Sequence, residues 1–291
     1  MNFAAKGARP GLYLLASYPK SGNTWARLML DAWAADAPVD INRIATGVVT
    51  TSLPLFEELT DAEPGDMTES EMLAMRPAFA RALAADLGKH GEARWYKCHE
   101  ANLPPPATSA APYRADFVAG VALVVRDPRD VAVSLAHHNG IGIDEAIARM
   151  ADPTRIARPR DMQEQTSFLL SSWSRFNESW LDGPGPTPAL LRYEDMLAEP
   201  AAALARLLGV AGIGGDFESL RRATARCGFE TLAAQESARG FVERSTFSSA
   251  AFFRQGRAGA WREILAPTQR VEIETAHGAM MRRLGYLETR P

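Results

Sequence analysis

Residues 14–25 read Leu-Leu-Ala-Ser-Tyr-Pro-Lys-Ser-Gly-Asn-Thr-Trp, and this stretch decides the fold. The apolar run up to Ala16 predicts a buried strand, which the residues from Pro19 to Gly22 end in a tight loop. Thr24 is expected to cap the helix that follows. The apolar residues of that helix recur at the spacing of one helical face: Trp25, Leu28, Met29, Ala32 and Trp33. A strand, a glycine-containing loop and a helix together bind phosphate-like anions well, because the first amides of a helix lack partners inside it.

The loop itself supplies further donors for an anion. Lys20 carries a full charge, and Ser21 and Thr24 carry hydroxyl groups. The loop is not a Walker A sequence, in which the lysine follows the second glycine, because Lys20 precedes Gly22. The pattern therefore favours an anion site that is not an ordinary ATP or GTP site. A plain strand-to-helix turn with a surface lysine is the alternative.

The composition excludes several classes of protein. With 291 residues and 46% hydrophobic residues, the chain suits one large α/β domain or two small ones. A net charge of -3 gives no reason to expect nucleic acid or an anionic membrane as the main partner. The two cysteines cannot form a disulfide framework, and the longest apolar run, residues 117–125, is too short to span a bilayer. Residues 1–16 resemble a signal peptide only faintly, so we expect a soluble cytoplasmic protein without membrane insertion.

Strands and helices alternate along the chain. Further strands are predicted at 93–99, 118–125 and 189–193, and this alternation indicates a parallel sheet flanked by helices. Ligands bind such sheets beyond the carboxyl ends of the strands. Candidate motifs at 20–24, 97–99 and 126–134 all lie at such ends, and this coincidence is stronger evidence for a binding site than any one motif.

Helix signals accompany the third strand and recur later. Asp127 is a favourable N-cap, and Asp130 stands where a capping box places an acid. A helix is predicted over 161–181, with its aromatic residues in the core. Residues 37–76 are expected to form loops and short helices, and residues 138–160 a mobile flap. Both segments are expected to be flexible and to shape a pocket.

Two further groups of residues are candidates for binding anions. Arg126 and Ser134 follow the third strand, and their alternative role is a salt bridge from Arg126 to a neighbouring aspartate. A third contribution comes from a loop with two arginines and two glycines, which is otherwise a solvated loop. Its residues are Arg254, Gly256, Arg257 and Gly259. Taken together, these groups indicate a ligand with two separated anionic groups.

His99 is the candidate acid–base residue. It lies two residues after Lys97 at the end of a strand, so both side chains point to the same side. Histidine has a suitable intrinsic pKa for a base at neutral pH. An edge histidine beside a lysine is the alternative, and an ordinary surface or core role is expected for the remaining histidines. These are His90, His137, His138 and His277.

Metal signals are absent from the sequence. It has no Cys/His spacing for zinc and no acid cluster of the kind that holds magnesium in kinases. The chemistry is therefore expected to be a group transfer that needs no metal.

These motifs resemble those of the cytosolic-type sulfotransferases that use 3′-phosphoadenosine-5′-phosphosulfate. Residues 18–25 resemble the family's 5′-phosphosulfate loop, and residues 97–99 its Lys-Thr-His segment. Residues 126–134 resemble its 3′-phosphate motif, 193–196 its Tyr-Glu-Asp segment, and 254–261 its Arg-Lys-Gly-x-x-Gly-x-Trp loop. The five motifs keep the family's order. The resemblance implies a single domain over residues 1–291, with the three-layer α/β fold related to P-loop NTPases.

The resemblance also implies a role for each matched residue. His99 would be the general base, Lys97 would help to hold the sulfuryl group, and Lys20 would stabilise the leaving 5′-phosphate. The residues implied to donate to the 5′-phosphate are Ser21, Gly22, Asn23 and Thr24. The residues implied to hold the 3′-phosphate are Arg126, Ser134, Arg254 and Gly256. Adenine would lie against Trp25, Tyr193 and Phe229. For Trp25, this role competes with its expected place in the core, on the apolar face of the helix.

The sequence departs from the family pattern in four places. Asn23 replaces a threonine but keeps a donor, and Gln255 replaces a lysine beside the 3′-phosphate site. Residues 227–229 replace the usual Thr-Ser-Phe. Glu100 follows His99 where an apolar residue is typical, so it is expected either to alter the pocket or to raise the basicity of His99.

The leading hypothesis is transfer of a sulfuryl group to a hydroxyl, or with less support an amine, of a small-molecule acceptor. A nucleotide kinase of related fold and a non-catalytic nucleotide-binding module are the competing hypotheses. The missing Walker A pattern argues against the kinase, and the joint presence of Lys20, Lys97 and His99 argues against the module.

Overall fold

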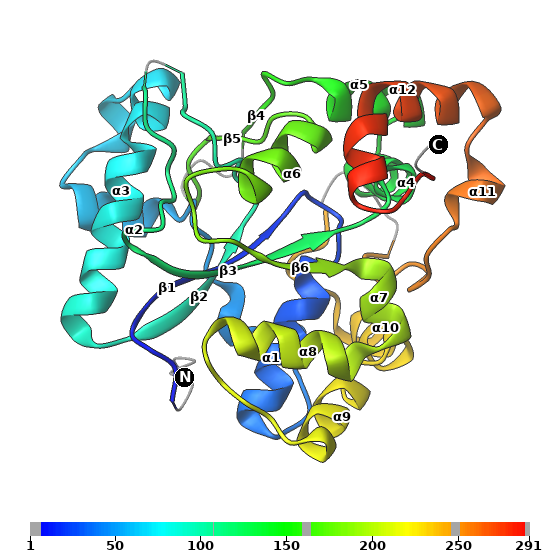
Figure 1. The fold of residues 1–291 in the computed structure, drawn as a ribbon, viewed down its shortest axis with the longest axis horizontal. Coiled ribbons are helices and arrows are strands. Elements are labelled where there is room, and N and C mark those ends of the chain that lie inside the picture. The colour runs from blue at the N-terminus through cyan, green and yellow to red at the C-terminus, as the bar shows by residue number, and fades with distance from the viewer. Residues whose placement is uncertain (1–6, 107, 159–163, 246–250, 289–291) are drawn as a thin grey trace.

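Four parallel strands form the centre of the molecule, in the order β2-β1-β3-β6 (Figure 1). The strands are β1 (Gly11–Ser17), β2 (Ala93–Cys98), β3 (Val118–Val125) and β6 (Ala189–Arg192). The structure is a computed structural model that describes residues 7–106, 108–158, 164–245 and 251–288. All four strands lie where the sequence predicts them, because each is a short run that the core buries.

The two faces of the sheet build two separate cores. In β1, Leu12 and Leu14 point into one core, whereas Tyr13 and Leu15 point into the other, and all four are nearly inaccessible to solvent. This alternation follows the period of two of a strand, and burial on both faces is typical of parallel sheets. The predicted three-layer α/β architecture is therefore confirmed.

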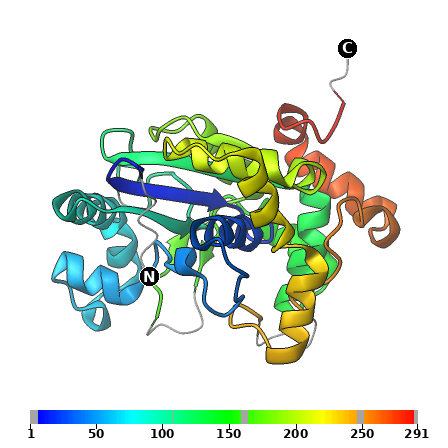
Figure 2. The ribbon, with the colours of Figure 1, turned by 90° about the horizontal axis from the view of Figure 1, so that it is seen from below.

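Helices cover both faces of the sheet, as Figures 1 and 2 show from two directions. The helices that contribute to the first core are α2 (Leu53–Thr60), α3 (Glu69–His90), α4 (Pro128–Asn139), α5 (Ile143–Ala151), α6 (Trp173–Leu181) and α12 (Pro267–Arg283). Those that contribute to the second core are α1 (Asn23–Ala35), α7 (Tyr193–Ala198), α8 (Pro200–Val210), α9 (Phe217–Ala225) and α10 (Phe229–Arg239). The short helix α11 (Trp261–Ile264) adds Trp261 to the first core. The remaining elements are η1 (Ala45–Gly47), η2 (Pro64–Asp66) and the short antiparallel pair β4 (Ile156–Ala157) and β5 (Phe168–Leu169). Among the helices that the structure describes, none combines the length and apolar character needed to cross a bilayer.

The turn between β1 and α1 differs from the expectation that Thr24 caps the helix. Helix α1 begins at Asn23, and the N-cap is Gly22, whose φ of 108° lies in the left-handed region. The Asn23 side-chain amide donates to the Leu15 carbonyl at 2.9 Å and to Ser17 Oγ at 3.2 Å. The first helical residue therefore ties the helix back to the strand that precedes it.

Of the two aspartates predicted to cap α4, only Asp127 does so. Asp127 caps α4 as predicted, since its carboxylate accepts from the Arg129 amide at 3.0 Å. Asp130 does not close a capping box. Its two oxygens instead accept from the amides of Gly259 at 2.6 Å and Trp261 at 3.0 Å. Asp130 thereby holds the C-terminal glycine loop against α4.

The helix predicted over 161–181 is wrong in its first half. Residues 161–163 lie outside the described residues, Leu169 belongs to β5, and α6 begins only at Trp173. Ser171 has a φ of 63°, and the Ser172 side chain accepts from the Arg175 amide, so the chain turns sharply and the helix is capped there. The core role of the aromatic residues of α6 is confirmed, because Trp173, Phe176 and Trp180 are all buried.

The two segments expected to shape a pocket contain short regular elements. Residues 37–76 include η1, α2, η2 and the start of α3. Residues 138–158 include the end of α4, α5 and β4, and residues 159 and 160 lie outside the described residues. The flexibility of both segments stays a prediction.

Glu100 faces away from His99, contrary to either expected effect on the pocket. Its carboxylate accepts from Arg76 at 3.0 and 2.8 Å and from the Tyr113 hydroxyl at 2.8 Å. Arg76 and Glu100 are both fully buried. Cys98, the last residue of β2, packs in the first core, and Glu100 is buried on that side with Arg76, whereas His99 lines the pocket described below.

We predict that Glu100→Gln lowers the free energy of unfolding by about 3–5 kcal/mol, because it leaves the Arg76 charge buried without its counter-charge. Urea unfolding followed by circular dichroism measures the change. Asp116→Asn, which breaks an exposed ion pair to Arg81, serves as the control and should leave stability nearly unchanged. A Glu100→Gln protein as stable as the wild type would contradict the prediction.

Candidate active site

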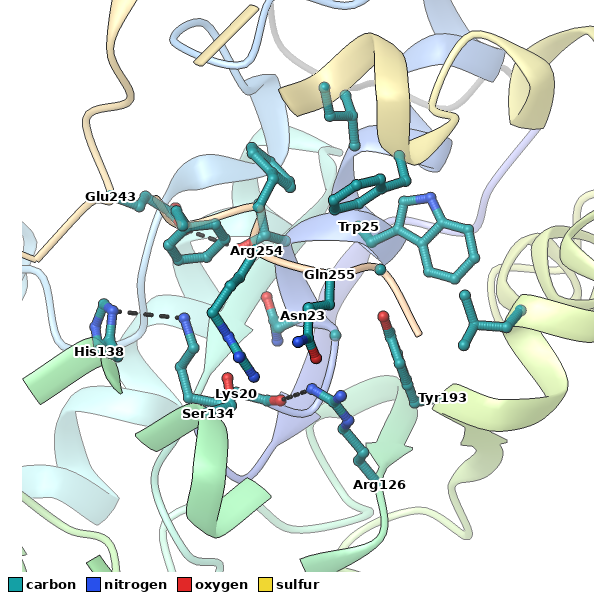
Figure 3. Close-up of a pocket in the computed structure, with 18 of the residues that line it drawn as sticks. Lys20, Asn23, Trp25, Arg126, Ser134, His138, Tyr193, Glu243, Arg254 and Gln255 are labelled. Atoms are coloured by element: carbon teal, nitrogen blue, oxygen red, sulfur yellow. Dashed lines mark hydrogen bonds between the residues drawn. The ribbon is translucent and has the colours of Figure 1, made fainter. Parts of the chain in front are cut away.

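A pocket of about 390 Å³ lies beyond the carboxyl ends of the four parallel strands. Residues that follow β1, β2, β3 and β6 line it together, as the topology of the sheet predicts. The sequence-predicted site residues in its wall are Lys20, Gly22, Asn23, Thr24, Trp25, Lys97, His99, Arg126, Ser134, Tyr193, Phe229, Arg254, Gln255 and Gly256. Figure 3 shows Lys20 and His138 on one side of the pocket and Trp25 and Tyr193 on the opposite side.

Lys20 is held in a strained and electrostatically unfavourable position. Its φ of 70° is uncommon for a residue with a side chain. Its ammonium lies 3.8 Å from the centre of the Phe252 ring and 3.5 Å from His138 Nδ1. Burial, reinforced by the charge of Lys97, lowers the pKa of Lys20 to about 7. An anion placed in the pocket would relieve this cost, because it favours the charged lysine.

A backbone carbonyl fixes the orientation of the His99 imidazole. Its Nδ1 lies 2.6 Å from the Ser17 carbonyl oxygen, which can only accept, so Nδ1 carries the proton and Nε2 keeps its lone pair. Burial lowers the pKa of His99 to about 3, and the neighbouring charges of Lys97 and Arg27 act in the same direction. His99 is therefore neutral at physiological pH. Lys97 lines the same pocket, so the predicted pairing of these two side chains is confirmed.

A second group of cations surrounds Arg126. Its Nη1 donates to the Lys20 carbonyl and its Nη2 to the Arg257 carbonyl, each at 3.2 Å. Arg126 does not form the salt bridge to a neighbouring aspartate that was the alternative, because Asp127 binds Arg129 and Asp130 binds the glycine loop. Burial and the charges of Arg126 and Arg257 lower the pKa of Arg254.

Polar atoms in this second group lack partners. Among the described residues, Arg126 Nε and Gln255 Oε1 are buried without a hydrogen bond. Gly256 has a φ of 57°, and a β-carbon there would lie 2.4 Å from the Phe229 ring. Glycine is thus the residue that lets this loop pass close to Phe229 while its neighbours face the pocket.

Aromatic side chains line the far side of the pocket. The rings of Trp25 and Tyr193 have centres 6.0 Å apart, and Arg126 lies 4.3 Å from the Tyr193 ring centre. Trp25 Nε1 donates to the Cys227 carbonyl at 2.9 Å, and the side chain is partly exposed to the pocket. This wall offers apolar faces to a flat ring, which favours the ligand role of Trp25 over a purely core role.

Two residues of the loop use their side chains differently from the expectation. Ser21 is fully buried and lies outside the pocket lining. The Asn23 amide is engaged by β1, as described above, and its Oδ1 accepts from Arg27 Nε at 2.9 Å. The side chains of both residues are thus not directed at the pocket as donors, although their backbone amides remain at the start of α1.

Two ionisable residues of the pocket, His138 and Glu243, are not predicted from the sequence as site residues. His138 lies one helical turn after Ser134 on α4, a spacing of four residues that places both on one face. That spacing was the available signal for His138. Glu243 reaches the pocket from the segment after α10, and no local pattern marks it. Of the two segments expected to shape a pocket, 138–158 supplies His138 to the described lining and 37–76 supplies no residue.

A metal site would need several carboxylates, histidines or cysteines close together. Within residues 7–106, 108–158, 164–245 and 251–288, no group of at least three such side chains is close enough to hold a metal ion.

Comparison with known proteins identifies the family. A model of the sulfotransferase domain matches residues 112–285. Cytosolic sulfotransferase 17 of Arabidopsis thaliana is 23% identical, over 97% of this chain and 78% of that protein. Sulfotransferase 1A1 of Canis lupus familiaris is 24% identical, over 96% of this chain and 86% of that protein.

Solved structures share the fold at low sequence identity. The mouse sulfotransferase SULT7A1 complexed with PAP superimposes with a TM-score of 0.54 and 13% identity, covering 95% of this chain and 85% of that one. Retinol dehydratase in complex with androsterone and the inactive cofactor PAP gives a TM-score of 0.51 and 19% identity, covering 100% of this chain and 85% of that one. The family model spans more than half of the chain, and the chain therefore belongs to the sulfotransferase domain family.

Proposed function

We propose that this sulfotransferase moves a sulfuryl group from 3′-phosphoadenosine-5′-phosphosulfate to a hydroxyl of a small molecule, with His99 as the general base. The observation that carries the proposal is the His99 imidazole. Its protonated Nδ1 is fixed on the Ser17 carbonyl, which leaves the Nε2 lone pair for a proton, in a pocket lined by Lys20 and Lys97. An amine acceptor has less support, because an ammonium group would meet several cations in the same pocket.

The pocket suits the donor in charge and shape. Lys20 and the first amides of α1 form one group of donors, and Arg126 with Arg254 forms another. Trp25 and Tyr193 provide an apolar wall, and the unpartnered Arg126 Nε offers a donor to an anion. The structures of the mouse sulfotransferase and of retinol dehydratase contain PAP (3′,5′-adenosine bisphosphate), the product that this donor leaves after transfer, and they support the assignment of the donor.

The residues of the chain have distinct tasks in the transfer. The bound donor supplies an activated sulfuryl group, whose bond to the 5′-phosphate breaks as the acceptor oxygen bonds to sulfur. His99 Nε2 takes the proton of the acceptor hydroxyl and later releases it to solvent. Lys20 stabilises the negative charge that develops on the departing phosphate oxygen, and Lys97 holds the sulfuryl oxygens.

The low pKa of His99 is compatible with this task. The value of about 3 reflects burial and the cations around the imidazole. Negative charge brought by the donor favours the imidazolium, and so raises the pKa of His99 towards its ordinary value. His99 becomes a stronger base only once the donor is bound, which couples proton removal to the presence of the group to be transferred.

The acceptor is a small molecule in our proposal, as in the retinol dehydratase complexes with androsterone and with retinol. Phe252 and Phe253 bring apolar surface into the pocket, and His138 lies beside Lys20. We place the reaction in the cytoplasm, because the Arabidopsis relative is named cytosolic and Cys98 and Cys227 are free thiols.

Membership of the sulfotransferase family argues against both alternative functions, a phosphotransferase and a non-catalytic nucleotide-binding module, and two measurements test them. Sulfuryl transfer that continues in EDTA would exclude a metal-dependent kinase. Tight binding of 3′,5′-adenosine bisphosphate (PAP) without transfer to any acceptor in a broad screen with radiolabelled donor would favour the module.

We expect His99→Ala to lose turnover by a factor of about 10²–10⁴ while it folds normally and binds PAP as the wild type does. Transfer from radiolabelled donor measures turnover, and titration calorimetry measures binding. His90→Ala, on an exposed part of α3, is the matched control. Turnover near the wild-type rate in His99→Ala would show that another group is the base.

Gly256→Ala is expected to weaken PAP binding by about tenfold or more, because its β-carbon would collide with Phe229 in a backbone conformation that favours glycine. Calorimetry measures the affinity. Gly209→Ala, at a position in α8 with open space around it, should bind PAP normally. Unchanged affinity in Gly256→Ala would place the 3′-phosphate elsewhere.

PAP affinity should fall as the pH rises above about 7, because free Lys20 has a pKa of about 7 and the bound anion raises it. Above pH 7 binding must then take up a proton, and affinity decreases by up to about tenfold per pH unit until the raised pKa is reached. Calorimetry in two buffers of different ionisation enthalpy measures the proton uptake. Lys20→Arg stays charged and should lose this pH dependence. Equal affinity of the wild type at pH 7 and pH 9 would refute the assignment of Lys20.

A further inference from the structure

Glu243 stands out as an acid in a pocket of cations. The pocket lining includes Lys20, Lys97, Arg126 and Arg254, and among its described residues Glu243 is the single carboxylate. An isolated carboxylate there would oppose the binding of an anionic donor. We therefore expect the charge of Glu243 to be neutralised by cations of the protein itself.

Three side chains, from α1 and β2, meet at this carboxylate. Arg27 Nη2, from α1, donates to both oxygens at 2.7 and 2.8 Å. The Thr24 hydroxyl donates to it at 2.9 Å, and Lys97 Nζ, from β2, lies 3.5 Å away. Glu243 itself comes from the segment after α10, and Figure 3 shows it on the Lys20 side of the pocket. One side chain thus joins the anion-binding turn to the strand that carries the base.

The burial of these groups makes the contacts costly to lose. Only 1% of the Arg27 side chain and 18% of the Lys97 side chain are exposed, compared with 22% of Glu243. Two poorly hydrated cations would repel each other without an anion between them. Arg27 and Lys97 together outnumber Glu243 in charge, so the cluster keeps a net positive charge.

The charge state of Lys97 depends on every ionisable group around it. Burial lowers the pKa of Lys97, Glu243 raises it, and Arg27 lowers it. Lys20 from the turn, His99 from the end of β2 and His138 from α4 also face this region of the pocket. Burial alone would raise the pKa of Glu243, but Lys97 and Arg27 outweigh it and lower the pKa to about 2. Glu243 is therefore ionised at any physiological pH.

We propose that Glu243 is a positioning residue, which acts through Lys97 by keeping that lysine charged and directed at the sulfuryl group. The inference rests on the proposed function, in which Lys97 holds the sulfuryl oxygens. An ammonium group has three N–H donors, so a contact with Glu243 leaves donors free for a substrate oxygen. Glu243 itself touches neither the donor nor the acceptor in this role.

A direct test follows the protonation of Lys97 without any turnover. The chain has four lysines, Lys6, Lys20, Lys89 and Lys97, so reductive ¹³C-methylation gives few NMR signals, and Lys97→Met assigns the one of interest. Glu243→Gln removes the charge at nearly constant size, and we expect it to move the titration midpoint of Lys97 down by about one pH unit. Glu272→Gln, which removes an exposed carboxylate from α12, is the matched control and should leave the midpoint in place.

Kinetics then separate positioning from simple structural support. Glu243→Gln should lower kcat by about tenfold and shift the alkaline limb of the kcat–pH profile to lower pH, whereas PAP affinity stays within about threefold, because PAP lacks the sulfuryl group. Glu243→Asp keeps the charge and should recover part of the loss. On a Lys97→Met background Glu243→Gln should cost little more, since the two residues act as one unit.

Two results would overturn the inference. The first is an unchanged Lys97 midpoint in Glu243→Gln. The second is a PAP affinity about tenfold higher in Glu243→Gln, which would mark the carboxylate as a competitor for the anion site. A wild-type protein that transfers no sulfuryl group would refute the proposed function instead, and the NMR midpoint would still decide whether Glu243 controls Lys97.

Discussion

Repulsion among buried cations is the constraint on which the pocket depends. The parallel sheet delivers the ends of β1, β2 and β3 to one edge, and each end brings a basic residue: Lys20, Lys97 and Arg126. Two of the four lysines in the chain thus share one pocket. Burial lowers the pKa of both; the charge of Lys97 adds to the effect on Lys20, and the charge of Arg27 adds to that on Lys97, so the site is least stable when it lacks an anion. The same unfavourable energy becomes binding energy for a ligand with several negative charges.

The scaffold around the pocket must be rigid to hold like charges together. Leu12 and Leu14 anchor β1 in one core, and Tyr13 and Leu15 anchor it in the other, so the strand cannot withdraw from the charged edge. The buried pair of Arg76 and Glu100 fixes the chain directly after β2 in the first core. The side chains of the adjacent residues 99 and 100 therefore lie in different parts of the molecule. His99 faces the pocket, while Glu100 keeps the end of the strand in place.

The sequence predicts the sheet and most of the pocket because both depend on local signals. Each strand is a short apolar run, and the residue types directly after it show what lies at the carboxyl edge. The predictions fail where a distant contact decides the outcome. Asp130 looks like a helix-capping acid but binds the glycine loop, which lies about 130 residues further along the chain. Glu243 meets Arg27 across 216 residues, and no periodicity encodes such a pairing. The start of α6 depends on the backbone of Ser171, which the aromatic spacing of the helix does not reveal.

The residue at position 23 connects the anion turn to the rest of this network. Asn23 uses its amide nitrogen on the Leu15 carbonyl and its oxygen on Arg27. A threonine there has no second polar atom with which to hold both. Arg27, once oriented by Asn23, reaches Glu243, and Glu243 reaches Lys97. A side chain that would otherwise serve as one more donor to a phosphate thus becomes the first link of a chain of contacts from the turn to β2. The asparagine at position 23 and the acid at position 243 together allow Arg27 and Lys97 to be packed close to His99.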